Sequence, residues 1–181
     1  MRKDDTMYIG IDPGFNGTGI AGVHRGKIVL LRTITCPGRM ALSMHTWQEP
    51  AFRIADKLVR TLGECNPASP QKITLEFPEV WGGSAKSYAS ATQGHIPILC
   101  ALCGVIVQAL QPTDVQTIFP GEWKGQLAKG ASQRRIFAYT TKHRMWSATN
   151  PGEMFIKPGK TQYEHEVDAI GIALYGMGVK I

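Results

Sequence analysis

Hydrophobic and polar residues follow the short period of β-strands near the N-terminus and the longer period of α-helices further on. Three apolar segments come first, separated by the turn-rich residues 13–17 and 25–26, which is typical of an antiparallel meander. Later, apolar residues recur about every 3.6 positions, which predicts helices. The predicted strands are 7–12, 18–24, 27–34, 72–76 and 114–119, and the predicted helices are about 49–63, 89–110, 132–143 and 163–175.

The order βββαβαβα, in which the last α stands for the two consecutive helices 132–143 and 163–175, predicts an α/β fold with a mixed five-stranded sheet flanked by helices. The sheet is expected to be antiparallel at first and to cross over through helices later. Residues 120–124 are predicted to form a turn. Because the sequence contains no internal repeat and no linker, residues 1–181 are expected to form a single domain.

Composition favours a globular protein that associates with polyanions. The 181 residues are 43% hydrophobic, which excludes a disordered chain, and 20 Lys and Arg against 14 Asp and Glu give a net charge of +6. The excess is concentrated between residues 124 and 160, where Glu153 is the single acid. Such a segment favours binding to phosphates, although a solvated helix face is the alternative. Its eight basic residues are Lys124, Lys129, Arg134, Arg135, Lys142, Arg144, Lys157 and Lys160.

The longest apolar run, residues 96–110, is shorter than the ~20 residues that a bilayer span requires and contains Pro97 and Gly104. We therefore expect a buried helix and no membrane partner. The N-terminus lacks the apolar stretch of a signal peptide, so a cytoplasmic location is expected. Cys100 and Cys103 lie within the apolar run, which favours core packing over a metal or redox site.

Three acidic residues stand at positions where carboxylates are unusual. Asp12 ends an apolar strand and is followed at once by Pro-Gly, and Glu76 ends another strand. Asp168 lies in the last predicted helix, three residues after His165 and on the same face. A turn-forming aspartate and an edge glutamate in water are the alternatives for the first two. If the three carboxylates converge, they form an oxygen-rich site suited to Mg²⁺ or Mn²⁺ and to phosphodiester hydrolysis.

Three motifs, taken together, resemble the RuvC family of Holliday-junction resolvases, and its phage-encoded members in particular. Residues 9–14 (IGIDPG) followed by 17–19 (GTG) are similar to the first motif of that family, residues 75–76 (LE) to the second, and residues 165–173 to the C-terminal one. The resemblance spans about residues 7–175. It implies a ribonuclease-H-like fold.

The resemblance further implies a catalytic, metal-binding set made of Asp12, Glu76, His165 and Asp168, with Mg²⁺ or alternatively Mn²⁺ and two ions per site. Family members carry Asp or His three residues before the last Asp. His165 is therefore expected either to bind metal or to orient or deprotonate the attacking water, and Glu164 is an alternative ligand.

The resemblance places expected DNA contacts in two segments, and the basic segment 124–160 independently adds Lys129, Arg134 and Arg135. Lys124 is the first candidate for a catalytic contact near the scissile phosphate. The loop after Glu76 is expected to reach the branch point, where Trp81 or Tyr88 would stack on an unpaired base, although both are alternatively core residues. The expected DNA-binding residues are Trp81, Lys86, Tyr88, Lys129, Arg134 and Arg135.

The sequence thus predicts a metal-dependent endodeoxyribonuclease that resolves four-way junctions by paired incisions. Paired incisions imply a two-fold homodimer, to which residues 96–110 could contribute. A flap, fork or three-way branch nuclease with the same site and a non-catalytic junction-binding protein are the alternatives. An ATP-binding domain of the actin and sugar-kinase type is disfavoured, because the sequence has no second phosphate-binding Asp-Gly loop.

Overall fold

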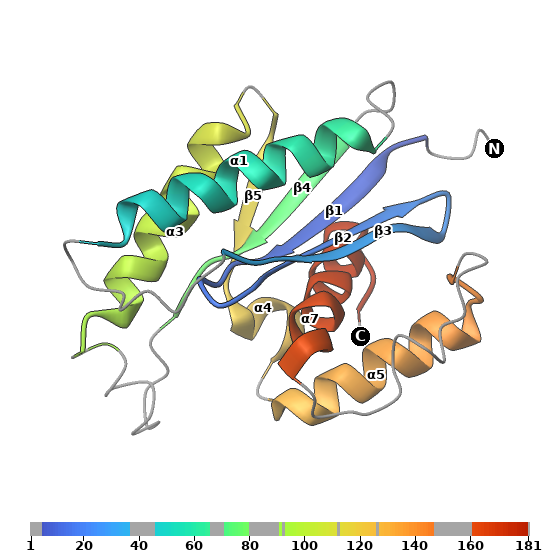
Figure 1. Ribbon diagram of the computed structural model, residues 1–181. Coiled ribbons are helices and arrows are strands. Elements are labelled where there is room, and N and C mark those ends of the chain that lie inside the picture. The colour runs from blue at the N-terminus through green and yellow to red at the C-terminus, as the bar shows by residue number, and fades with distance from the viewer. Residues whose placement is uncertain are drawn as a thin grey trace.

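The computed structural model describes residues 5–36, 46–65, 71–79, 91, 93–111, 113–125, 127–146 and 161–180. One sheet runs through the molecule with helices on both of its faces (Figure 1). The strands are β1 (Met7–Asp12), β2 (Thr18–His24), β3 (Lys27–Ile34), β4 (Gln71–Glu76) and β5 (Val115–Ile118). The helices are α1 (Gln48–Glu64), α3 (His95–Ala109), α4 (Pro120–Lys124), α5 (Lys129–Lys142) and α7 (Thr161–Gly176).

The sheet has five strands in the order β3-β2-β1-β4-β5. The first three strands form the expected antiparallel meander, whereas β1 pairs with β4 and β4 with β5 in parallel. The predicted mixed sheet is confirmed. Ile11 of β1 lies opposite Leu75 of β4. The next residues, Asp12 and Glu76, are the last of their strands and therefore lie at the same end of the sheet.

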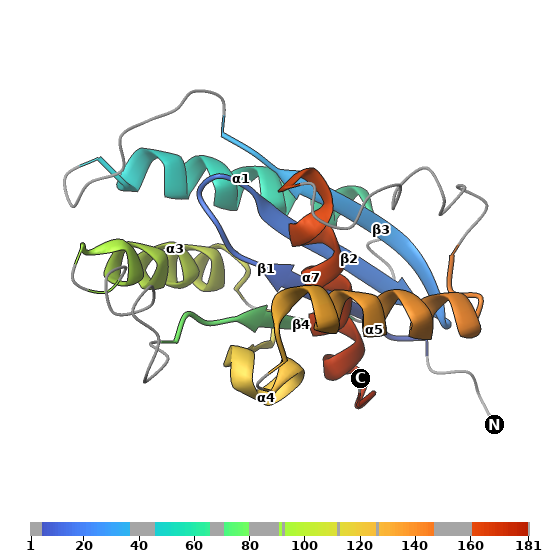
Figure 2. The ribbon, with the colours of Figure 1, turned by 90° about the horizontal axis from the view of Figure 1, so that it is seen from below.

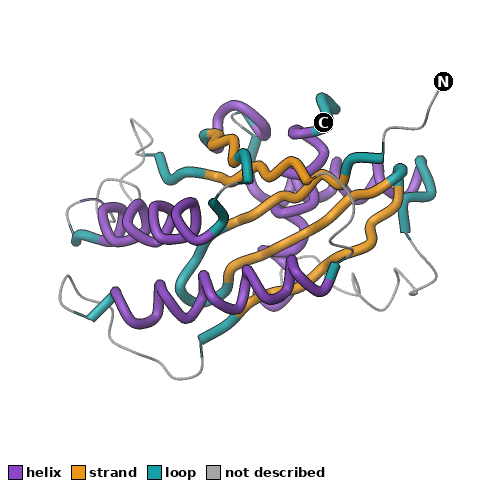
Figure 3. Tube along the Cα trace, turned by 90° about the horizontal axis from the view of Figure 1, so that it is seen from above, coloured by secondary structure: helices purple, strands orange, loops and turns teal. Residues whose placement is uncertain are grey.

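Helices α1 and α3 cover one face of the sheet (Figure 3) and pack against each other. Their inward residues are fully buried against the aliphatic side chains of the central strands. Burial of this apolar area is the main stabilising contribution on this face. The helix residues that are at most 1% exposed are Ala51, Ile54, Leu58, Leu102, Cys103 and Ile106.

Helix α7 crosses the opposite face, with α5 beside it (Figure 2) and α4 packed against its second half, where Trp123 meets Gly171. Its backbone lies directly on the strands at two glycines. A Cβ atom on Gly10 would stand 2.0 Å from the carbonyl oxygen of Ala169, and one on Gly19 would stand 2.0 Å from that of His165. Only glycine permits so close an approach, which fixes the position of His165 relative to the strand ends.

Three sequence-based boundaries were wrong. Residues 120–124 form the short helix α4 instead of a turn, because Pro120 occupies the first helical turn and the Glu122 carboxylate accepts a hydrogen bond from the Phe119 amide. Helix α3 begins at His95 instead of about residue 89, after Gly94 with φ 78°. Helix α5 begins at Lys129, three residues before the predicted start. Among the described helices, none combines the length and apolarity that a membrane span requires.

Candidate active site

Two strand ends and one helix bring the predicted acidic residues together. Asp12 is the last residue of β1 and Glu76 the last of β4, while α7 passes across this end of the sheet and carries Asp168. The three carboxylate side chains are 13%, 15% and 6% exposed, respectively. Asp12 is close enough for its charge to raise the pKa of both Glu76 and Asp168. Three mostly buried carboxylates therefore share one site.

Asp12 is bonded to the histidine that the sequence singled out. The Nδ1 atom of His165 lies 2.6 Å from Oδ2 of Asp12. This hydrogen bond raises the pKa of His165, and burial of the imidazole opposes the rise. The imidazole is thereby oriented by a carboxylate, which is the arrangement that fixes the ring of a histidine acting on water or metal.

Glu76 is held by two neighbouring residues of α4. The indole N–H of Trp123 donates a hydrogen bond to Oε2 of Glu76, and Nζ of Lys124 lies 3.4 Å from the same oxygen. Burial raises the pKa of Glu76, the positive charge of Lys124 lowers it, and the charge of Asp12 raises it again. The net direction is upward, so burial and repulsion outweigh the lysine.

Asp168 receives contacts on both of its oxygens from α5. Nε2 of Gln133 donates to Oδ1 at 3.2 Å, and Nζ of Lys129 lies 3.3 Å from Oδ2. Lys129 also lies 3.1 Å from Oε2 of Glu164, so Glu164 is held by this lysine. Burial, followed by the charge of Asp12, raises the pKa of Asp168 against these contacts.

The donor set fits a hard divalent cation. The negative charge of Asp12 raises the pKa of Glu76 and of Asp168, and such a concentration of negative charge favours the binding of positive charge. Carboxylate oxygen is the ligand that Mg²⁺ and Mn²⁺ prefer. Within the described ranges, however, no three acidic, histidine or cysteine side chains surround a single point closely enough to hold an ion. In this arrangement His165, Lys124 and Lys129 supply the positive partners, so ion binding requires some of these contacts to be exchanged.

The predicted DNA-binding residues separate into three groups. Arg134 and Arg135 are exposed on α5, the helix from which Gln133 contacts Asp168. Lys129, expected at the DNA surface, is half-exposed and touches the carboxylates instead. The remaining residues, Trp81, Lys86 and Tyr88, lie outside the described residues.

Sequence reasoning missed two residues that contact the site, Trp123 and Gln133. Trp123 stands directly before Lys124. The signal available in the sequence is the residue type, because the indole N–H of a tryptophan usually has an internal partner once the ring is buried. Gln133 offers no such signal, because a glutamine on an amphipathic basic helix is usually solvated. Its contact with Asp168 depends on the packing of α5 against α7.

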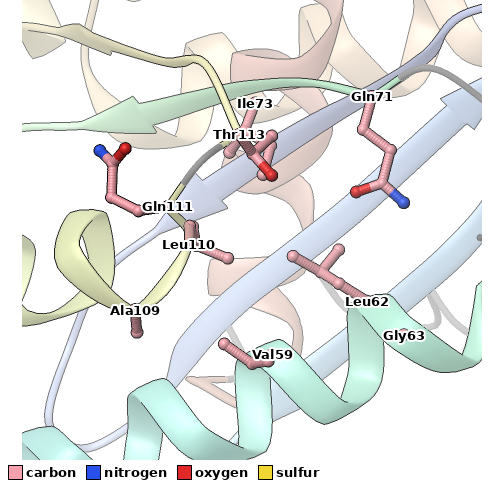
Figure 4. Close-up of a pocket in the computed structure, with 9 residues that line it drawn as sticks. All are labelled: Val59, Leu62, Gly63, Gln71, Ile73, Ala109, Leu110, Gln111 and Thr113. Atoms are coloured by element: carbon pink, nitrogen blue, oxygen red, sulfur yellow. The ribbon is translucent and has the colours of Figure 1, made fainter.

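The other candidates for chemistry are Cys103, whose Sγ lies 3.9 Å from the carbonyl oxygen of Glu76, and a hollow at the far end of β4. Cys103 is fully buried, and burial raises the pKa of its thiol to about 12, in keeping with core packing. A hollow of about 390 Å³ lies among α1, the end of α3 and the start of β4, at the opposite end of that strand from Glu76 (Figure 4). Its lining contains no titratable side chain, so it offers no acid, base or nucleophile. The lining residues are Val59, Leu62, Gly63, Gln71, Ile73, Ala109, Leu110, Gln111 and Thr113.

Comparison with known proteins identifies the fold. No protein-family model and no curated protein matches the sequence. Among solved structures, the chain is similar to Thermus thermophilus RuvC in complex with a Holliday junction substrate, at a TM-score of 0.59 and 17% identity, over 93% of this chain and 90% of that one. It is also similar to the yeast mitochondrial Holliday junction resolvase Ydc2, at a TM-score of 0.60 and 12% identity, over 97% and 79% of the two chains.

A third similar structure is the human cytomegalovirus terminase nuclease domain, at a TM-score of 0.51 and 16% identity, over 95% of this chain and 83% of that one. At these identities the likeness concerns the fold. The chain has the mixed sheet and flanking helices of the ribonuclease-H-like fold, in the form found in RuvC. The fold expected from the sequence motifs is thereby confirmed.

Proposed function

We propose that this protein is a metal-dependent endonuclease that cleaves branched DNA, with the four-way junction as its substrate. The observation that carries the proposal is the cluster of Asp12, Glu76 and Asp168, delivered by β1, β4 and α7 to one end of the sheet. Mutually repelling buried carboxylates are costly to the fold, which is typical of a site that binds cations for catalysis. Two of the structurally similar proteins are RuvC in complex with a Holliday junction substrate and the Holliday junction resolvase Ydc2.

The chain's own residues divide the work in this proposal. Asp12, Glu76 and Asp168 would hold Mg²⁺ or Mn²⁺, two ions per site, which when bound supply charge neutralisation at the phosphate and an activated water. His165, oriented by Asp12, would hold the attacking water or complete the ligand set. Lys124, next to Glu76, would contact the scissile phosphate once its contact with that carboxylate is exchanged.

The basic face of α5 supports the choice of a nucleic acid as substrate. Arg134 and Arg135 are exposed on the helix from which Gln133 contacts Asp168, and exposed arginines suit the phosphate backbone, which is bound without reading the base sequence. Paired incisions call for two sites related by two-fold symmetry. We therefore propose a homodimer, with the outward side of α3 contributing to its interface, acting in the cytoplasm of the cell or of a phage-infected host.

Cleavage of a labelled four-way junction tests the proposal directly. Linear duplex, flap and three-way substrates are compared in Mg²⁺, Mn²⁺ or EDTA, with Asp12→Asn as the inactive control. We expect paired, metal-dependent incisions at symmetric positions of the four-way junction. Preferential cutting of flaps or three-way branches would replace the substrate, cutting of linear duplex would move the assignment toward the terminase type, and binding without cleavage would contradict a nuclease.

A further inference from the structure

A tryptophan that the catalytic proposal does not use is built into the acidic site. Trp123 lies on the short helix α4 and is 6% exposed. Its indole N–H points at Oε2 of Glu76, the carboxylate at the end of β4. A buried carboxylate that accepts a hydrogen bond from a rigid ring has its rotamer fixed, which a flexible lysine cannot achieve alone.

The ring of Trp123 packs against α7, the helix that carries His165 and Asp168. A Cβ atom on Gly171 of α7 would stand 2.5 Å from Cζ3 and 3.1 Å from Cε3 of Trp123, so the indole lies where α7 has no side chain. Gly171 follows Asp168 by three residues, less than one helical turn. Trp123 therefore connects the backbone next to one acidic residue with the carboxylate of another.

The ring of Trp123 also contacts the neighbouring residue, Lys124. Nζ of Lys124 lies 4.8 Å from the centre of the Trp123 ring, within cation–π distance, and 3.4 Å from Oε2 of Glu76. Trp123 thus contacts both partners of this ion pair. The indole favours the ionised form of Glu76, since its hydrogen bond lowers a pKa that burial raises.

We infer that Trp123 is a positioning residue that sets the Glu76 carboxylate for metal binding through its indole N–H. The inference rests on the proposed function, because it takes Glu76 as a ligand. Residues that orient a metal ligand without touching the metal typically change affinity by about 10- to 100-fold when they are removed. Trp123→Phe keeps an aromatic ring on Gly171 and removes the N–H.

The first test measures Mn²⁺ binding to DNA-free protein from the electron paramagnetic resonance signal of the unbound ion. We expect Trp123→Phe to weaken Mn²⁺ binding by about 10- to 100-fold. The matched control is Trp47→Phe, which makes the same chemical change beside the α1 and α3 core and is expected to leave affinity unchanged. In the Glu76→Ala background, Trp123→Phe should have no further effect, since the group it acts through is gone.

Two further measurements separate positioning from simple packing. Replacing Trp123 by 3-benzothienylalanine keeps the bicyclic shape and exchanges N–H for sulfur, so the loss of affinity should persist even if the phenylalanine variant folds poorly. With the wild type active on junctions, Trp123→Phe should lower kcat and leave KM and junction binding in EDTA unchanged.

The inference and the proposed function fail in different ways. If wild-type protein binds Mn²⁺ and cleaves junctions while both Trp123 variants bind Mn²⁺ with wild-type affinity, the positioning role is wrong and the proposed function stands. An additive effect in the Glu76→Ala background would also overturn it, because Trp123 would then act elsewhere. If wild-type protein neither binds Mn²⁺ nor cleaves, the proposed function itself is wrong and the positioning role falls with it.

Discussion

The face of the sheet under α1 and α3 is packed with branched aliphatic side chains, whereas on the opposite face α7 meets β1 and β2 through glycine. On the first face, Leu58 and Leu102 fill the space between helix and sheet and are fully buried. On the second, Gly10 and Gly19 leave no such space, and the helix backbone touches the strands. The first face contributes stability through buried aliphatic volume. The second buries a hydrophobic cluster of its own around α7 and, at the two glycines, also brings the helix backbone and its polar groups close to the strands.

This difference explains where charge is buried. The side of the sheet that α7 covers holds Asp168 at 4% exposure, together with the polar contacts from α4 and α5. The hydrophobic cluster under α1 and α3 contains no buried charged residue among the described residues. Substitutions under α1 and α3 should therefore reduce stability alone, whereas substitutions where α7 contacts the strands should also reduce activity.

We expect the largest effect from Asp12→Asn, which should abolish most of the cleavage activity. The substitution removes a charge from the site without removing volume, so we expect cleavage to fall at least about 1000-fold, on the order of 4 kcal/mol of transition-state stabilisation. Junction binding in EDTA should persist. Gel-based cleavage and binding assays check both results, and equal loss of the two would show that Asp12 is structural.

The next effect separates the two faces by stability. Leu58→Ala should lower the free energy of unfolding by about 2–5 kcal/mol because it leaves a cavity under α1, while the protein that remains folded cleaves at the wild-type rate. Gly10→Ala should reduce both stability and cleavage, since its Cβ would push Ala169 and the whole of α7 away from β1. Urea denaturation and cleavage rates measured on the same samples distinguish these outcomes. Equal loss of activity per folded molecule in both variants would contradict the division.

A smaller effect is expected from the exposed arginines of α5. Replacing Arg134 and Arg135 together by Ala should weaken junction binding and flatten its dependence on salt by up to about 1.8 in log–log slope, about 0.9 for each phosphate that the protein no longer neutralises. Fluorescence anisotropy across a salt series measures the slope. The control is the double variant Arg53→Ala and Arg60→Ala on α1, where both arginines are exposed and paired within their own helix. An unchanged slope in the α5 variant would show that this helix faces away from DNA.

The smallest effect concerns stability against pH. Burial, and then the charge of Asp12, raises the pKa of Glu76 in the folded protein, so ionisation favours the unfolded chain. The loss of stability caused by ionised Glu76 is fully present at a pH above its folded-state pKa. It disappears as the pH falls below the ordinary pKa of a glutamate side chain. Glu76→Gln should therefore melt slightly above wild type at pH 7.5 in EDTA, and the difference should vanish toward pH 4. A lower melting temperature at pH 7.5 would mean that the contacts with Trp123 and Lys124 outweigh the repulsion.

The sequence predicted the strands and the strand-end carboxylates because both rest on local patterns. The apolar runs and the turns around residues 13–17 and 25–26 determine the meander, and all five strands lie where the pattern indicated them. The start of α3 was misplaced because apolar periodicity continues upstream of Gly94, whose positive φ ends the preceding turn. Helix α4 was predicted as a turn because Pro and Gly are common to turns and to the first turn of a helix.

The contacts within the site could not be predicted in the same way. Whether a lysine side chain contacts a carboxylate depends on how the helices pack. Lys129 is predicted to bind DNA, and the contacts of its ammonium group with Asp168 and Glu164 follow only from the position of α5 against α7. The motifs indicated that Asp12, Glu76, His165 and Asp168 belong together, but they carry no information on the partner of each oxygen. The hydrogen bond from Trp123 to Glu76 depends on the packing of the indole ring against Gly171, a residue far away in the chain.

The hydrogen bond between Asp12 and His165 joins residues separated by 153 positions. During synthesis, Asp12 and Glu76 leave the ribosome long before His165 and Asp168, and β1 and β2 present Gly10 and Gly19 to no helix until α7 has been made. A nascent or prematurely terminated chain therefore holds two of the three acidic residues and none of the helix that carries the third. Under the proposed function, the full acidic site therefore exists only after the last helix has docked.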